Sequence, residues 1–206
     1  MLLLSENCQI NIQNQFIATQ YQFTPQFFKL ITFGFWPAAV EGLWIQTMQF
    51  IGTGKYPPSA VPAVRQFYDL ATDLDPNFYE LYDQSAILFS ILFESADDAE
   101  HFLNKGIAVY KSGTAPAAFW THPVTLYIYL GYVQAFQQHD WAKAKQTYLE
   151  ASMLPNPLPW LVDMRHWLQE KNSEKRLARN VITIMINGTK DEEVKKILRE
   201  KLKKYE

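Results

Sequence analysis

The sequence predicts an all-α protein: an array of antiparallel helical hairpins with about ten helices in 206 residues. Three observations support this class. Helix start and stop signals follow one another from Thr24 onward. Beyond the first residues, no block alternates polar and apolar residues as strands do. Small and aromatic residues also recur at a fixed spacing. With 48% hydrophobic and 19% charged residues, the chain can fill a core and is not intrinsically disordered.

The first residues differ from the rest. Polar and apolar residues alternate from Cys8 to Gln13, which is a strand period, and Asn and Gln recur up to Gln26. We expect an extended N-terminal arm over residues 1–23, either loosely ordered or paired with a neighbouring chain. Met1–Leu4 lacks the basic flank and the long apolar stretch of a secretory signal.

Caps and prolines position the first five helices. Thr24 and Pro25 suit the N-cap and the first position of a helix. Pro76 begins a helix after the preceding one ends, and Ser95 with Asp98 resembles a capping box. The predicted helices span residues 24–33, 37–51, 59–73, 76–93 and 95–110.

The same signals position the second five. Pro123 and Asp140 suit helix starts, and Gly188 suits a left-handed C-cap. Thr189 with Glu192 forms a second candidate capping box. The predicted helices span residues 122–138, 140–154, 160–170, 173–187 and 189–205.

Four pairs of similar residues are each 45 positions apart, and stacked hairpins need small residues where helices cross closely. The pairs are Tyr82 and Tyr127, Ala86 and Gly131, Ala99 and Ala144, and Gly106 and Ala151. This pattern resembles the tetratricopeptide repeat (TPR), with an aromatic residue, Leu and Gly on one helix, then Ala, an aromatic residue and Ala on the next, then Pro. One copy matches at Tyr127, Leu130, Gly131, Ala144, Tyr148, Ala151 and 155–157. Another matches at Tyr82, Ala86, Phe89, Ala99, Leu103 and Gly106.

The resemblance implies a right-handed superhelical array over residues 24–206. The repeats would span about 37–76, 77–111 and 123–157, followed by capping helices over 158–206. The period is longer than the family's, because residues 111–122 form an inserted loop. Residues 33–52 also resemble the start of a group of bacterial proteins of this type, many of which have a membrane anchor. A cytoplasmic or membrane-associated location is therefore expected, with the compartment left open.

The charge is unevenly distributed. Residues 1–170 carry a formal charge of −7 and residues 171–206 carry +5, for a total of −2. This total argues against a general nucleic-acid binder. Nine acidic residues from Asp69 to Glu100 occur without an intervening Lys or Arg, which indicates a solvated face or a site for a basic partner. Residues 124–136 are apolar throughout but too short to span a membrane, so we expect a buried core helix.

No motif predicts catalysis, a metal or a cofactor. Gly52–Lys55 lacks the first Gly and the final Ser or Thr of a phosphate loop. The four histidines have no metal-ligand spacing, and Cys8 is alone. We therefore expect a non-enzymatic protein.

The expected function is protein–protein recognition, as a scaffold or an accessory subunit of a larger assembly. Because the first helix of each repeat lines a concave groove in the resembled family, the implied groove has an acidic strip beside an aromatic one, suited to a basic and apolar peptide or helix. Alternatives are a ligand-binding or catalytic helical domain, and a peripheral membrane protein using the basic helix near residues 195–204. The candidate partner-binding residues are Glu80, Asp83, Ile87, Thr125, Ile128 and Tyr132, with Phe119 and Trp120 in the inserted loop.

Overall fold

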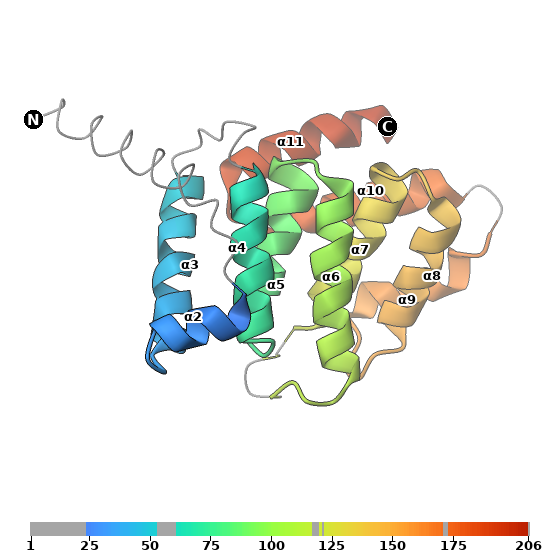
Figure 1. Cartoon of the computed structure of the whole chain (residues 1–206). Helices are drawn as coiled ribbons and strands as arrows, with labels where there is room; N and C mark the ends of the chain where they lie inside the picture. Colours follow the sequence, from blue (N-terminus) through green and yellow to red (C-terminus); the bar gives the residue numbers. More distant parts are fainter. Residues whose placement is uncertain (1–23, 53–60, 117–119, 121, 171–172, 206) are drawn as a thin grey trace, which may run out of the picture. The chain divides into compact units, whose positions relative to one another are not determined.

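The structure is a computed structural model that describes residues 24–52, 61–116, 120, 122–170 and 173–205. The chain divides into two compact units, Met1–Leu81 and Tyr82–Glu206. All regular structure in the described residues is helical, and no strand occurs among them (Figure 1). This confirms the all-α class. The predicted arm over residues 1–23 lies outside the described residues.

The first unit contains α2 (Pro25–Ile31), α3 (Trp36–Gly52) and α4 (Val61–Leu74). The side-chain oxygen of Thr24 accepts a hydrogen bond from the backbone nitrogen of Phe27 at 3.3 Å, which confirms the predicted cap. On α4, buried residues recur at helical spacing and turn one face to the core, where α4 contacts α2 and α3. These residues are Val64, Tyr68, Ala71 and Leu74.

Helix α5 (Tyr79–Ile87) contains the boundary between the units, which falls inside the predicted 77–111 repeat. It continues directly into the π-helix η2 (Leu88–Leu92). The single helix predicted over residues 76–93 is therefore an α-helix that ends in a wider π-turn.

In its described residues, the second unit continues through six α-helices and a short 3₁₀ turn. In chain order these are α6 (Ala96–Lys111), α7 (Val124–Phe136), α8 (Trp141–Ser152), α9 (Pro159–Trp167), α10 (Ser173–Gly188), α11 (Glu192–Leu202) and η3 (Lys203–Tyr205). Helices α6, α7 and α8 pack side by side in sequence (Figure 1). Helix α7 is central, because η2 and α10 also contact it and all its residues except Thr125 and Phe136 are buried. The predicted buried core helix is confirmed.

The small residues of the predicted repeat lie at close helix crossings. A Cβ added to Gly106 would come within 2.9 Å of side-chain atoms of Leu126 and Tyr82. At Gly131 it would come within 2.5 Å of the Tyr148 ring. Both distances are shorter than real contacts, so a larger residue at either position would displace a neighbouring side chain.

Asp140 caps α8 as predicted, because its carboxylate accepts a hydrogen bond from the backbone nitrogen of Lys143 at 2.9 Å. Three other predictions about helix ends need correction. Gly188 has no positive φ and is the last residue of α10. The cap of α11 is Asp191, not Thr189, because the Asp191 carboxylate accepts from two backbone nitrogens, at 2.8 and 3.2 Å. At α6, the Ser95 hydroxyl donates to the Asp98 carboxylate at 2.6 Å and accepts no capping bond from the backbone.

Candidate functional site

A hollow of about 490 Å³ lies between η2 and α11, in the second unit. Its apolar lining residues are Ile91, Leu92, Phe93 and Ile197. Its charged lining residues are Glu94, Glu200, Lys201 and Lys204. We call this feature the η2–α11 hollow. A concave surface that combines apolar and oppositely charged groups can hold an amphipathic segment.

The wide π-turn shapes one wall of the hollow. The Phe93 nitrogen donates to the Leu88 carbonyl at 2.8 Å, five residues back, and the Ser95 nitrogen donates to the Phe89 carbonyl at 2.8 Å. The Ser90 carbonyl instead accepts from the side-chain amide of Gln137, at 2.6 Å. A residue just beyond α7 therefore helps to hold the turn open. Turns of this kind occur frequently at functional sites.

Glu94 follows η2, lines the hollow and has an unusual backbone conformation. Its φ is 50°, in the left-handed region that residues other than glycine enter infrequently. Its carboxylate lies 2.8 Å from the Lys201 amine on α11, and 58% of its side chain is exposed. This ion pair connects η2 to α11 across the hollow.

The Lys201 amine also lies over the ring of a tyrosine. It is 5.5 Å from the centre of the Tyr132 ring on α7. Burial raises the pKa of the Tyr132 hydroxyl, and the charge of Lys201 opposes that rise. Burial also favours the neutral form of Lys201, but Tyr132 and Glu94 outweigh it and raise the pKa of the amine. Lys201 is therefore a cation at neutral pH, held between a carboxylate and a ring.

A cluster of aromatic rings connects η3 to the end of α7 and the start of α8. The Tyr205 ring lies 5.5 Å from Phe136 and 6.4 Å from Trp141, both in edge-on geometry. The Tyr205 carbonyl accepts from Arg179 on α10 at 2.9 Å. The segment from α11 to Tyr205 is thus fixed on α7 by a cation over one ring and by an aromatic cluster.

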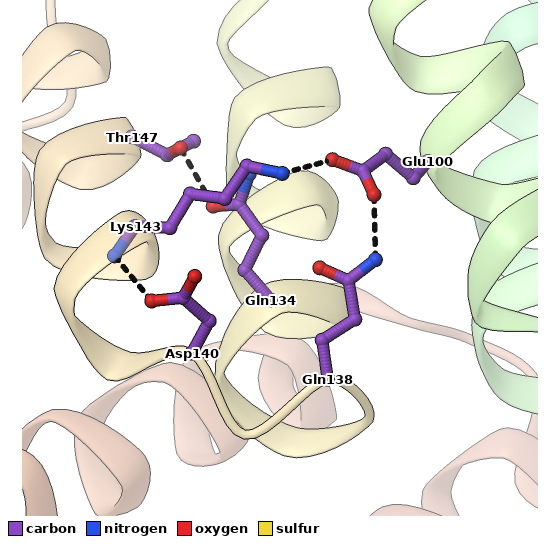
Figure 2. A network of polar contacts seen from close by, with 6 residues as sticks. All are labelled: Glu100, Gln134, Gln138, Asp140, Lys143 and Thr147. Atoms are coloured by element: carbon purple, nitrogen blue, oxygen red, sulfur yellow. Dashed lines mark hydrogen bonds and ion pairs between the residues drawn. The ribbon is translucent and has the colours of Figure 1, made fainter.

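A separate polar network joins α6, α7 and α8 (Figure 2). The Glu100 carboxylate accepts from Lys143 and from Gln138, each at 2.5 Å. Burial opposes ionisation of Glu100, but these hydrogen bonds outweigh it and lower its pKa. Nearby, the buried Thr147 hydroxyl donates to the Gln134 amide oxygen at 2.7 Å. The network satisfies polar groups where helices meet, so we interpret it as structural.

The structure separates the predicted site residues by exposure. Glu80 is exposed, and Asp83, Ile87 and Thr125 are half-buried. Ile128, Tyr132 and Trp120 are buried, with 7, 0 and 4% of their surface exposed. Phe119 lies outside the described residues. A role for any of these residues in partner binding stays a prediction.

Two of the buried aromatic residues have clear surroundings. The Trp120 ring lies 5.7 Å from Tyr82 and 6.4 Å from Tyr110, so it packs against α5 and α6. Tyr132, expected to face a basic partner, lies beneath Lys201 of the same chain. Sequence reasoning missed Glu94 and Lys201 as a pair. Each belongs to a charge run visible in the sequence, but nothing in the sequence indicates that the two runs meet.

Apolar side chains are also exposed in the first unit, around α2 and the turn that follows it. Leu30, Phe33 and Phe35 are 70, 88 and 74% exposed. Lys29 lies 5.0 Å from the centre of the Trp36 ring. Groups of exposed apolar residues are typical of surfaces that contact other molecules.

Comparisons with known proteins give no match: no family model fits the chain, and no curated protein or solved structure resembles it detectably. Within the described residues, no helix has both the length and the apolar character needed to cross a membrane. The same residues contain no group of three His, Cys, Asp or Glu side chains able to hold a metal ion.

Proposed function

We propose that this protein is a non-catalytic protein–protein interaction module that recognises a basic amphipathic helix or peptide of a partner. The observation that carries the proposal is the position of Lys201, 2.8 Å from Glu94 and 5.5 Å from the Tyr132 ring. A carboxylate beside an aromatic ring provides both parts of a lysine-binding site. The apolar wall of the η2–α11 hollow would hold the partner's apolar side chains.

The module would be a scaffold or an accessory subunit built from TPR-like hairpins in a right-handed superhelix. Gly106 and Gly131 support this architecture, because an added Cβ at either would clash with a neighbouring side chain. Ala86, Ala99, Ala144 and Ala151 support it too, since all have no exposed surface. Resemblance to the family rests on these positions.

The membrane-associated alternative is less favoured by the packing of α11. Val194 and Leu198, on the apolar face of this basic helix, have no exposed surface. The side chains that would enter a bilayer therefore pack against the protein. Sedimentation with anionic vesicles at low and high salt tests this alternative directly. Salt-sensitive co-sedimentation would support it, and its absence would favour the protein partner.

The proposal is tested by titrating the full chain with a synthetic amphipathic helix of Leu and Lys. A matched Leu and Glu helix serves as the peptide control. We expect Glu94→Gln to weaken binding of the Leu and Lys helix by about three- to tenfold, since it removes one partly exposed charge partner. Asp163→Asn removes an exposed carboxylate of α9 outside the hollow and should leave binding unchanged. Equal binding by wild type and both variants would overturn the assigned surface.

A further inference from the structure

Helix α11 has the chemistry expected of the partner. It is an eleven-residue helix with two buried apolar residues, Val194 and Leu198, one helical turn apart. Residues 192–204 are net basic, since three Glu side chains are outnumbered by six Lys and Arg side chains: Lys195, Lys196, Arg199 and Lys201 inside the helix, and Lys203 and Lys204 just after it. It is a basic amphipathic helix seated beside a wall of three apolar residues and the Glu94 carboxylate.

The contact between α11 and η2 is only partly closed. The open η2–α11 hollow lies beside the contact between the two elements, and the bridging Glu94 side chain is 58% exposed. An eleven-residue helix is also marginal when isolated, so α11 depends on its packing against α10 and η2 and on the contact of Lys201 with the Tyr132 ring of α7. Two of the eleven residues of α11 are buried, and an element with few buried side chains can open locally and exchange with a competitor.

We propose that α11 and η3 form an intramolecular occupant of the partner site, so that a partner helix binds by replacing them. This inference rests on the proposed function and adds its regulation. The partner is a basic amphipathic helix that places a lysine between Glu94 and Tyr132, where Lys201 lies. Its apparent affinity is reduced by the fraction of molecules in which α11 is docked. Loosening α11 should therefore tighten partner binding without any new contact to the partner.

The test measures binding of a labelled peptide with the sequence of residues 189–206 to the full chain. The receptor variants are wild type, Lys201→Ala and Lys196→Ala. Lys201→Ala removes the α11 group that contacts Glu94 and leaves the receptor wall intact. Lys196→Ala removes the same charge from an exposed position of α11. Lys201→Met keeps most of the apolar stem and serves as a second loosened variant. Circular dichroism confirms that each variant is folded.

We expect the peptide to bind Lys201→Ala and Lys201→Met about three- to tenfold more tightly than wild type, and Lys196→Ala like wild type. Equal binding to all four receptors would overturn the competition by α11 and leave the proposed function standing. No binding to any receptor would overturn the proposed function as well. Glu94→Gln combined with Lys201→Ala should lose the gain, because the peptide lysine then has no carboxylate partner.

Discussion

Gly131 on α7 faces the Tyr148 ring on α8, and replacing it with alanine tests this close crossing. The added Cβ would meet three ring carbons of Tyr148, at 2.5, 2.7 and 2.9 Å. Tyr148 is 1% exposed, and its hydroxyl donates to the Ile128 carbonyl at 3.2 Å. The ring therefore has no free space to enter and would lose a hydrogen bond if it moved.

The expected magnitude follows from three contributions. Overpacking a core costs about 1–3 kcal/mol. A weakened buried hydrogen bond adds about 1 kcal/mol, and the better helix propensity of alanine returns about 1 kcal/mol. We therefore expect Gly131→Ala to lower the free energy of unfolding by about 1–3 kcal/mol. At about 4 °C per kcal/mol for a unit of this size, the melting temperature should fall by about 4–12 °C.

The assay is urea and thermal unfolding followed by circular dichroism, with Gly188→Ala as the control. Gly188 has open space around its Cβ position and is the last residue of α10, so its substitution should leave stability unchanged or raise it by up to about 1 kcal/mol. In a Tyr148→Leu background, Gly131→Ala should cost less than in wild type, because the obstructing ring is gone. If Gly131→Ala were as stable as the wild type, the close crossing of α7 and α8 would be refuted.

Three further predictions concern the core and its titration. Thr147→Val removes the donor to the buried Gln134 amide oxygen and should lower the free energy of unfolding in urea by about 1–3 kcal/mol. Thr147→Ser should retain the hydrogen bond and lose less stability. Equal losses in the two variants would contradict this prediction. Trp120→Ala should cost about 3–5 kcal/mol, since the ring is 4% exposed, and a loss below about 1 kcal/mol would place it outside the core. Stability should also fall as the pH rises above about 10, because tyrosines that ionise near pH 10 when unfolded have raised pKa values when folded. Circular dichroism and tyrosinate absorbance should then change together, and tyrosinate formation without unfolding would contradict the effect. Burial raises the pKa of Tyr127 to about 12 and also raises those of Tyr68, Tyr129, Tyr132 and Tyr148.

The sequence predicts the helices well because their ends depend on local chemistry. Thr24 and Asp140 accept the capping bonds that their types and positions suggest. Gly106 and Gly131 can be recognised in the sequence because close helix crossings favour residues with small side chains. The error at Thr189 has a local cause too, since Asp191 is a competing cap and accepts two bonds.

The candidate site was less accessible from the sequence, because it depends on contacts between distant segments. The π-turn relies on Gln137, which reaches the Ser90 carbonyl from just beyond the end of α7. Glu94 and Lys201 each belong to a charge run, but only the packing of α11 brings them together. Periodicity indicates that Tyr132 lies on one face of its helix, and it does not indicate which element covers that face.

Hydrogen exchange of the full Lys201→Ala chain, with and without the peptide of residues 189–206, tests the central claim most directly. If the peptide replaces α11, the amides of residues 192–202 in the receptor should exchange faster when peptide is bound. Those of residues 88–94 should stay protected, because a helix still covers them. The account would be contradicted if the peptide bound while exchange over residues 192–202 stayed unchanged.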